Sequence, residues 1–249
     1  MNTRTAPTPP LVSNELDVLA AMLPLQHLAQ HRAAVNVIEL GCGNARLSRE
    51  LLELGLARSV TALEVDTRQH ALNLAKPHDN LTFLLAGAAA VPCGDASFDL
   101  AIMLKSLHHV PLHQMGRALN EVARLLKPGG WFYVSEPVYE GPLNDIVKLF
   151  NDEYMVRMAA QLALDEAVDR HDSPWKTLQE ERFDVPVRYA DWADFEQRML
   201  YPTFADHQID AAKLAIIRSA FERYAGSQAA TDGVRFTRPM HVRLLQKIT

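Results

Sequence analysis

The stretch Val35–Leu47, VNVIELGCGNARL, decides how the rest of this chain is interpreted. Its first half is an apolar, β-branched run, which is typical of a buried strand, and its second half is a turn of small residues at Gly41–Ala45. Leucines at helical spacing follow over Arg46–Leu54, and Gly55 is placed to end that helix. A strand, a glycine turn and a helix in this order bring backbone N–H groups and a helix N-terminus close to a ligand. The stretch therefore predicts a nucleotide-like cofactor site.

Glu39 is the unusual member of the predicted strand. A carboxylate at the end of an otherwise apolar strand is costly to bury unless a cationic or hydrogen-bond-donating group meets it. The alternative is a glycine turn with a stray acid, and the rest of the chain favours the cofactor site. A dinucleotide fingerprint is excluded, because its sixth position needs Gly or Ala and is Arg46 here.

From Glu39 to Ala45 the chain reads Glu-x-Gly-x-Gly-x-Ala. This resembles the first motif of the class I S-adenosylmethionine-dependent methyltransferases, in which the last position is usually a third Gly. The resemblance implies that Glu39 meets the methionine ammonium of S-adenosylmethionine. Ala45 departs from the motif by one methyl group, which is a mild change if its φ is negative.

Val60–Glu64 is a second predicted strand that ends in an acid. An acid at the end of the second strand of a doubly wound sheet can accept hydrogen bonds from ribose hydroxyls. We choose Glu64 for this role, with Asp66 as the competing candidate. Asp66 fits better as the cap of the helix expected from Thr67.

Later segments resemble the small-molecule, ubiquinone/menaquinone-methylase-like ("type 11") branch of that family. They are Gly87–Pro92, Ser97–Asp99, Leu107–His109 and the turn Lys127–Gly130. The branch often has an Asp at the position of Gly87 that accepts from the adenine amino group, so adenine recognition here is expected to rely on the backbone near Ala88 and on apolar walls. The cofactor-binding residues that the resemblance implies are Glu39, Gly41, Cys42, Gly43, Glu64, Val65, Gly87, Ala88 and Leu104.

The alternation of strand and helix patterns predicts an α/β fold with a doubly wound, Rossmann-like, mostly parallel sheet. The resemblance implies seven strands and an antiparallel last strand. We expect a flexible tail at 1–12 and a single methyltransferase domain at 13–249. A helical pattern over 144–170 favours a helical lid at 140–178, after strand five and above the carboxyl ends of the strands.

The implied reaction is in-line transfer of a methyl group to a small organic acceptor, with S-adenosylhomocysteine as the second product. His108 is the leading candidate for a general base, followed by His109 and Tyr139. The alternative for His108 is a structural imidazole bonded to the loop backbone. Glu136 and Tyr154 are the predicted substrate-binding residues; Glu136 can instead hold the lid, and Tyr154 can instead be core.

Composition limits the remaining possibilities. The 249 residues have a net charge of −5 and no basic run, which argues against nucleic acid as a partner. No apolar stretch approaches the roughly 18 residues that a membrane span needs. Two cysteines make neither a disulfide framework nor a metal site. We therefore expect a cytoplasmic monomer or homodimer. The rival functions are a methyltransferase with a protein substrate and a non-catalytic, regulatory S-adenosylmethionine-binding protein.

Overall fold

The computed structural model describes residues 8–23, 35–201, 207–228 and 232–248. They divide into two compact units where the sequence predicted one domain. The larger unit consists of Glu15–Glu136, Met155–Glu181 and the chain from Val242 onward. The smaller unit consists of the chain up to Asn14, Pro137–Tyr154 and Arg182–His241. Each unit has a hydrophobic core of its own.

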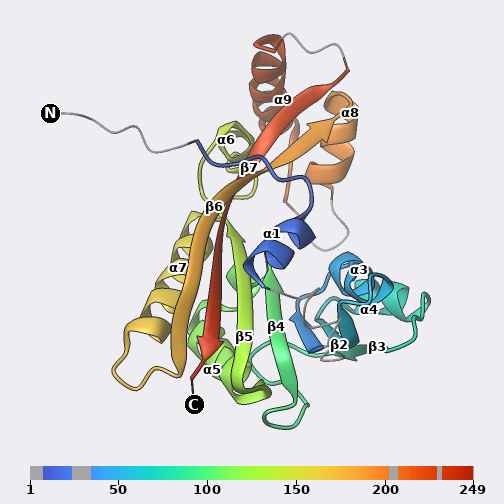
Figure 1. Ribbon diagram of the computed structural model, residues 1–249. Coiled ribbons are helices and arrows are strands. Elements are labelled where there is room, and N and C mark those ends of the chain that lie inside the picture. Colours follow the sequence, from blue (N-terminus) through green and yellow to red (C-terminus); the bar gives the residue numbers. More distant parts are fainter. Residues whose placement is uncertain (1–7, 24–34, 202–206, 229–231, 249) are drawn as a thin grey trace, which may run out of the picture. The chain divides into compact units, whose positions relative to one another are not determined.

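A seven-stranded sheet with the order β3-β2-β1-β4-β5-β7-β6 runs through the described residues (Figure 1). Its strands are β1 (Val35–Leu40), β2 (Ala57–Glu64), β3 (Leu81–Leu85), β4 (Phe98–Leu104), β5 (Leu126–Pro137), β6 (Trp175–Tyr189) and β7 (Val234–Lys247). The first five pair in parallel. In Figure 1, β7 runs opposite to β5 and β6. The predicted fold class is confirmed: α/β, doubly wound and mostly parallel, with an antiparallel strand inserted last.

Helices cover both faces of the sheet in the larger unit. They are α1 (Glu15–Met22), α3 (Arg46–Glu53), α4 (Thr67–Leu74), α5 (Met115–Leu125) and α7 (Tyr154–Asp169), with short turns η1 (Leu107–His109) and η2 (Leu112–Gln114). Ile38 and Phe132 point to the face where α5 and α7 pack. Glu39 and Tyr133, their neighbours along the strands, point to the opposite face. There they contact α3 and α1.

The helix α7 is a covering helix of the sheet. Its Ala160 and Leu164 are fully buried in the same core as Phe132 and Trp175. Burial of these two side chains favours a covering role for this helix, and the lid at 140–178 stays a prediction. The part of the predicted lid at 140–154 belongs to the smaller unit.

The predicted helical pattern over 144–170 is interrupted. The structure has a short helix α6 (Pro142–Val147), and α7 begins only at Tyr154. Asp152 explains the second start, because its carboxylate accepts a hydrogen bond from the backbone N–H of Tyr154 at 3.0 Å. An acid placed there satisfies one of the N–H groups that have no partner in the first turn of a helix.

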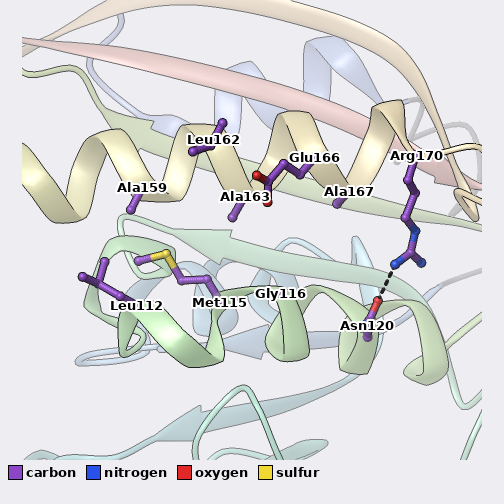
Figure 2. Close-up of a pocket in the computed structure, with 10 residues that line it drawn as sticks. All are labelled: Leu112, Met115, Gly116, Asn120, Ala159, Leu162, Ala163, Glu166, Ala167 and Arg170. Atoms are coloured by element: carbon purple, nitrogen blue, oxygen red, sulfur yellow. Dashed lines mark hydrogen bonds between the residues drawn. The ribbon is translucent and has the colours of Figure 1, made fainter.

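A groove of about 420 Å³ lies between α5 and α7 (Figure 2). Small residues make its floor: Gly116, Ala159, Ala163 and Ala167. Arg170 lies at one end, where its guanidinium donates a hydrogen bond of 3.3 Å to Asn120. The Arg170 side chain thus bridges the two helices at this end of the groove.

The predicted Lys127–Gly130 turn lies within β5, where it makes a bulge. Phe98 pairs with Leu126 but Leu100 pairs with Trp131, so the turn residues have no partners in the ladder of β4. A Cβ at Gly130 would lie 2.9 Å from the carbonyl oxygen of Lys127, and therefore glycine is required there. This geometry gives the turn a scaffold role, and β5 begins ahead of it, at Leu126.

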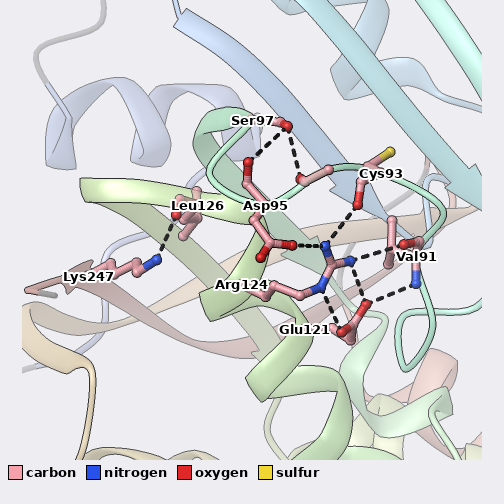
Figure 3. Close-up of polar contacts among 9 residues, drawn as sticks. Val91, Cys93, Asp95, Ser97, Glu121, Arg124, Leu126 and Lys247 are labelled. Atoms are coloured by element: carbon pink, nitrogen blue, oxygen red, sulfur yellow. Dashed lines mark hydrogen bonds and ion pairs between the residues drawn. The ribbon is translucent and has the colours of Figure 1, made fainter.

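Arg124 of α5 fixes the segment that joins β3 to β4 (Figure 3). Its guanidinium donates to the carbonyl oxygens of Val91 at 3.0 Å and Cys93 at 2.8 Å. It also pairs with Asp95 at 2.6 Å and with Glu121 at 2.9 Å. One guanidinium therefore ties a connecting loop to a helix at several points, and its planar fork of donors suits this task.

The smaller unit is built around aromatic side chains. It contains α6, α8 (Trp192–Phe195), the π-helical turn η3 (Glu196–Leu200), α9 (Ala211–Gly226) and parts of β6 and β7. Tyr189, Phe195, Phe221 and Phe236 are buried and in ring contact; Tyr189 and Phe195, for example, are 5.0 Å apart at 74°. A Cβ at Gly233 would lie 2.6 Å from the carbonyl oxygen of Tyr189, so this close approach requires glycine.

Candidate functional site

The carboxyl ends of β1 and β4 form the switch point of the sheet. From β1 the chain moves outward through β2 and β3, then returns to place β4 on the other side of β1. Such a reversal opens a crevice in which ligands of open α/β sheets bind. The floor of the crevice is tight, because a Cβ at Gly41 would lie 2.6 Å from Cβ of Ser106. The Ser106 hydroxyl donates to the carbonyl oxygen of Leu40 at 2.7 Å and joins the two strand ends.

The turn after β1 has a left-handed backbone at three positions. The φ angles are +83° at Gly41, +53° at Gly43 and +57° at Ala45. The condition of a negative φ at Ala45 is therefore not met, and this residue bears a strain of about 1 kcal/mol that glycine would not. Its methyl group is fully buried against Cys42 and Ala62, which offsets part of that cost.

The first N–H groups of this turn donate within the protein. Those of Gly41 and Cys42 donate to the carbonyl oxygen of Leu63 at 3.0 and 2.8 Å, and that of Gly43 donates to Oε2 of Glu64 at 2.9 Å. The expectation that the turn presents N–H groups to a ligand is wrong for these three. The turn instead offers a surface with little side chain, held in shape by the end of β2.

Glu39 lies beneath the turn and is 3% exposed. The hydroxyl and the backbone N–H of Ser48, in the first turn of α3, are its hydrogen-bond donors. Burial raises the pKa of Glu39 from 4.5 to about 7, against the opposing effect of these bonds and of Arg46. An acid this poorly compensated fits a cationic ligand group, because a nearby ammonium would stabilise its charged form. The residues present therefore fit the predicted contact with a methionine ammonium.

Glu64 has a different environment. Its Oε1 accepts from the N–H groups of Val65 at 2.8 Å and Asp66 at 2.9 Å, while Oε2 holds Gly43. A carboxylate has about four lone-pair sites, which leaves one for a ligand hydroxyl. Asp66 caps α4 by accepting from the N–H of Arg68 at 2.8 Å. The capping role predicted for Asp66 is confirmed, and the ribose contact of Glu64 stays a prediction.

An apolar wall stands beside this acid. Val65 is 68% exposed, and a Cβ at Gly87 would meet only its Cγ1, at 3.8 Å. A side chain at position 87 would therefore fit without a clash. This is the position at which related proteins often have an Asp, according to the resemblance. Ala88 packs against the core of the larger unit, and Leu104 is half-buried at the end of β4. These positions are consistent with a flat ring held between apolar side chains.

His108 and Glu136 form a buried pair at the ends of β4 and β5. Oε1 of Glu136 accepts from the N–H groups of Ser106 at 3.0 Å and Leu107 at 2.8 Å, and Oε2 contacts Nδ1 of His108. The sequence alternatives for Glu136 were substrate contact or lid contact, and the structure shows instead that it holds the loop after β4. The sequence alternative for His108 was a hydrogen bond to the loop backbone, whereas the structure shows a contact with the Glu136 carboxylate. The exposed His109 ring lies 4.0 Å from that of His108.

Tyr139 and Tyr154 lie in the smaller unit, where they contact each other. Their ring centroids are 5.1 Å apart at 73°, and the Tyr139 hydroxyl donates to Asp152 at 2.7 Å. These bonds hold the pKa of Asp152 below its ordinary value. Tyr154 is 48% exposed, so the alternative that it is ordinary core is wrong. The catalytic role of Tyr139 and the substrate contact of Tyr154 stay predictions.

Three polar residues of the site were missed by sequence reasoning: Ser48, Asn73 and Ser106. Asn73 of α4 is buried and donates to the carbonyl oxygen of Gly43 at 2.8 Å and to the sulfur of Cys42 at 3.7 Å. Burial also raises the pKa of the Cys42 thiol to about 12, so this thiol stays neutral. For Ser48 and Asn73 the available signal was a polar residue on the inner face of a predicted helix, where it must find a partner.

A buried acid and a glycine turn at the switch point of a doubly wound sheet are typical of α/β proteins that bind nucleoside-type ligands at the strand ends. Residues 38–134 match the family described as a methyltransferase domain. Over this segment the chain matches that family, which confirms the resemblance to S-adenosylmethionine-dependent methyltransferases seen in the sequence.

Curated relatives agree with this assignment. The chain is 32% identical over 120 residues to 27-O-demethylrifamycin SV methyltransferase of Amycolatopsis mediterranei, covering 46% of this chain and 40% of that protein. It is 29% identical over 127 residues to the ubiquinone/menaquinone biosynthesis C-methyltransferase UbiE of Rickettsia typhi, covering 47% and 50%. The match thus spans half or less of each relative.

A solved structure extends the likeness in fold across almost the whole chain. It is a putative methyltransferase from Bacillus halodurans, with a TM-score of 0.61 and 14% identity, covering 92% of this chain and all of that one. At this identity the likeness concerns the fold alone. No helix among the residues described here is long and apolar enough to cross a membrane.

Proposed function

We propose that the protein transfers a methyl group from S-adenosylmethionine to a small organic acceptor, and that it does so at the crevice between β1 and β4. The observation that carries the proposal is Glu39, a buried acid with a pKa of about 7 that has hydroxyl and amide donors but no ion-pair partner among the described residues. Its position below the glycine turn suits a ligand that brings a positive charge to the end of β1.

The chain supplies positioning and electrostatics to this reaction. S-adenosylmethionine brings a methyl group already activated on a sulfonium, so alignment and exclusion of water are the main tasks of the protein. Glu39 holds the amino end, Glu64 offers its remaining acceptor site to the ribose, and Val65 with Ala88 and Leu104 forms the apolar wall. The turn residues Gly41 to Gly43 let the ligand approach the backbone closely.

His108 is the proposed general base. Its Nδ1 contacts Glu136, which fixes the ring and leaves Nε2 to take the proton of a hydroxyl or amine acceptor. Glu136 is itself held by two backbone N–H groups, so the pair is rigid. Truncation of His108 to Ala is expected to lower kcat by about 10²–10⁴-fold and to leave the affinity for S-adenosylhomocysteine unchanged. His113→Ala, in the exposed turn η2, is the matched control.

Two measurements test the proposal. Calorimetric titration with S-adenosylhomocysteine is expected to show binding that Glu39→Ala weakens by about 1–3 kcal/mol. Release of S-adenosylhomocysteine from S-adenosylmethionine is then measured with the low-molecular-mass fraction of a cell extract as the acceptor source. No binding by the wild-type protein, or wild-type affinity in the Glu39→Ala variant, would refute the proposal.

The same assay separates the rival functions. Turnover only with the macromolecular fraction would favour a protein substrate, and binding without turnover in either fraction would favour a regulatory binding protein. A cytoplasmic location, the absence of nucleic-acid partners and a monomeric or dimeric state remain predictions from the sequence.

A further inference from the structure

A second buried acid lies at the same edge of the sheet, under the first helix. Glu15 of α1 is 5% exposed, and its Oε1 accepts a hydrogen bond of 2.8 Å from the hydroxyl of Tyr133. Ser135, two residues further along β5, is fully buried on the same face of the sheet. Among the residues that the structure describes, Oε2 of Glu15 and Oγ of Ser135 make no hydrogen bond of normal geometry, although the Ser135 hydroxyl lies close enough to Glu15 to lower its pKa.

These groups form a polar niche, defined by Glu15, Tyr133 and Ser135, that is incompletely satisfied. Burial raises the pKa of Glu15 above its ordinary value, and the nearby Ser135 hydroxyl, Lys105 and Arg46 reduce that effect without removing it. Buried polar atoms are almost always hydrogen-bonded in folded proteins, so two unpartnered atoms in one niche call for an explanation. A bound group that donates to both of them would provide it.

The niche lies on the same face of the sheet as Glu39. In the register of the sheet, Glu39 pairs with Ile102, and Ile102 pairs with Tyr133, so Glu39 and the tyrosine that donates to Glu15 share one row. Ser135 pairs with Leu104, the predicted cofactor contact at the end of β4. Arg46, at the start of α3, acts on the pKa of both Glu15 and Glu39. The niche therefore lies on the β5 side of the site, next to the place proposed for the cofactor.

We propose that Glu15 and Ser135 bind a protonated amino group of the methyl acceptor, so that the acceptor belongs to the class of organic amines. This inference rests on the proposed function, which it deepens by naming the substrate class. An ammonium carries three donors and no acceptor, and it can satisfy the Glu15 and Ser135 oxygens together. It also stabilises the charged form of a carboxylate that burial penalises. An anionic acceptor would be repelled by the same acid.

The proposal predicts an unusual effect on stability. A glutamate that served only the fold would leave the protein less stable when changed to glutamine. A ligand-binding glutamate with an unpartnered oxygen lowers the stability of the protein when no ligand is bound. Glu15→Gln keeps the acceptor for the Tyr133 hydroxyl and removes the penalised charge, so its Tm is expected to equal or exceed that of the wild type in the absence of ligand.

The test measures binding of fragment pairs to the full-length protein saturated with S-adenosylhomocysteine. The probes are phenethylamine against phenethyl alcohol and butylamine against butanol, titrated at pH 8 and followed by NMR. The wild type is expected to bind each amine about tenfold or more tightly than its alcohol, as hydrogen bonds to charged groups allow. Glu15→Gln is expected to remove the preference, and Ser135→Ala to reduce it. Asp17→Asn, an exposed acid on the same helix, is the control that keeps it.

Equal binding of amines and alcohols by the wild type would overturn the inference, as would an amine preference that survives in Glu15→Gln. A large loss of Tm in Glu15→Gln would assign the residue to the fold and overturn it as well. The titration of S-adenosylhomocysteine that precedes the probes keeps the two proposals apart. Failure of that titration refutes the proposed function, whereas cofactor binding without an amine preference refutes only the niche.

Discussion

Glu39 and Glu64 are two buried carboxylates at neighbouring strand ends, and their different hydrogen-bond partners give them different roles. Three backbone N–H groups surround Glu64, so this side chain holds the glycine turn to β2 whether or not a ligand is bound. Within the described part of the chain, the donors to Glu39 are the Ser48 hydroxyl and amide, and its pKa stays raised. The environment of an acidic side chain, more than its position in a motif, decides whether it stabilises the fold or can bind a cationic group of a ligand.

A pH dependence follows from the raised pKa of Glu39. Between pH 6 and pH 8 the carboxyl group loses its proton, so affinity for a ligand with an ammonium group is expected to rise by about tenfold over this range. Stability of the free protein changes in the opposite sense. The contribution of a group whose pKa is raised by folding is complete below 4.5 and is lost as the pH rises through about 7.

Calorimetry with S-adenosylhomocysteine at pH 6, 7 and 8 checks this, since its amino group stays protonated over most of that range. Glu39→Gln is the matched variant, because it keeps an acceptor for Ser48 but does not titrate. An affinity that is flat with pH in the wild type, or that has the same slope in the variant, would contradict the assignment.

The two glycines of the turn are expected to differ in their tolerance of a methyl group. Gly41→Ala adds a Cβ that would lie 2.6 Å from Cβ of Ser106, in addition to the strain of a φ of +83°. Gly43→Ala meets nothing within 4 Å and bears only the strain of its positive φ. Urea unfolding is expected to show a loss of about 1 kcal/mol for Gly43→Ala. The loss for Gly41→Ala is expected to be at least about 2 kcal/mol. Equal losses would mean that Ser106 moves away freely.

At the scale of residues, the sequence predicted the positions of Glu39, Glu64 and the glycines, because burial of an acid and breaks in a strand are visible in a linear pattern. It did not predict the positive φ of Ala45 or the contact of Glu136 with the loop after β4. The Glu136 contact depends on the distance between segments that lie far apart in the chain, whereas the signal for the φ of Ala45 was local, because the motif usually has a third Gly there.

At the scale of elements, α7 offers a direct test of its role as a covering helix. Leu164→Ala removes a fully buried side chain from the core and is expected to cost about 2–5 kcal/mol of unfolding free energy. Leu162, on the same helix, is 57% exposed at the groove between α5 and α7 (Figure 2), and Leu162→Ala is expected to cost about 0.5 kcal/mol. Chemical unfolding of both variants is the measurement. A mobile lid would instead give small and similar losses, with the larger change in KM.

Arg124 links an element to the site through a loop. Arg124→Lys keeps the charge but loses the fork that reaches Val91, Cys93 and Asp95 (Figure 3). We expect a stability loss of about 1–2 kcal/mol. Affinity for S-adenosylhomocysteine is expected to fall as well, because the loop continues from Gly87 and Ala88. Arg117→Lys, exposed on the same helix, controls for the substitution itself. Unchanged affinity in Arg124→Lys would show that the loop holds its position without this clamp.

The elements from β1 to β5 were predicted well, because hydrophobic periodicity and turn residues mark each of them. The region after β5 was predicted less well. The pattern over 144–170 has helical spacing throughout, and only the side-chain bond from Asp152 to the start of α7 explains why it breaks. A helix that packs on a sheet and a helix that closes over a site also share one amphipathic pattern, so the sequence alone did not separate them.

At the scale of the whole molecule, the chain has two cores that involve different side chains. Phe221→Ala removes a buried ring from the smaller unit and is expected to cost about 3–5 kcal/mol in that unit. The larger unit keeps its own core, so S-adenosylhomocysteine should still bind Phe221→Ala with an affinity close to that of the wild type. Tryptophan fluorescence follows unfolding of the smaller unit at Trp192 once Trp131 and Trp175 of the larger unit are replaced by Phe, and calorimetry follows binding. Loss of binding together with loss of Phe221 would show that the two units fold as one.

Three N–H groups of the turn between β1 and α3, those of Gly41, Cys42 and Gly43, donate to Leu63 and Glu64 within the protein. Recognition at this edge then needs no ordering of the backbone, and little conformational entropy is lost on encounter. Association at a ready-made surface is governed by diffusion and charge more than by rearrangement of the chain. S-adenosylmethionine and S-adenosylhomocysteine are therefore expected to exchange quickly at this site, which would allow many turnovers per protein molecule.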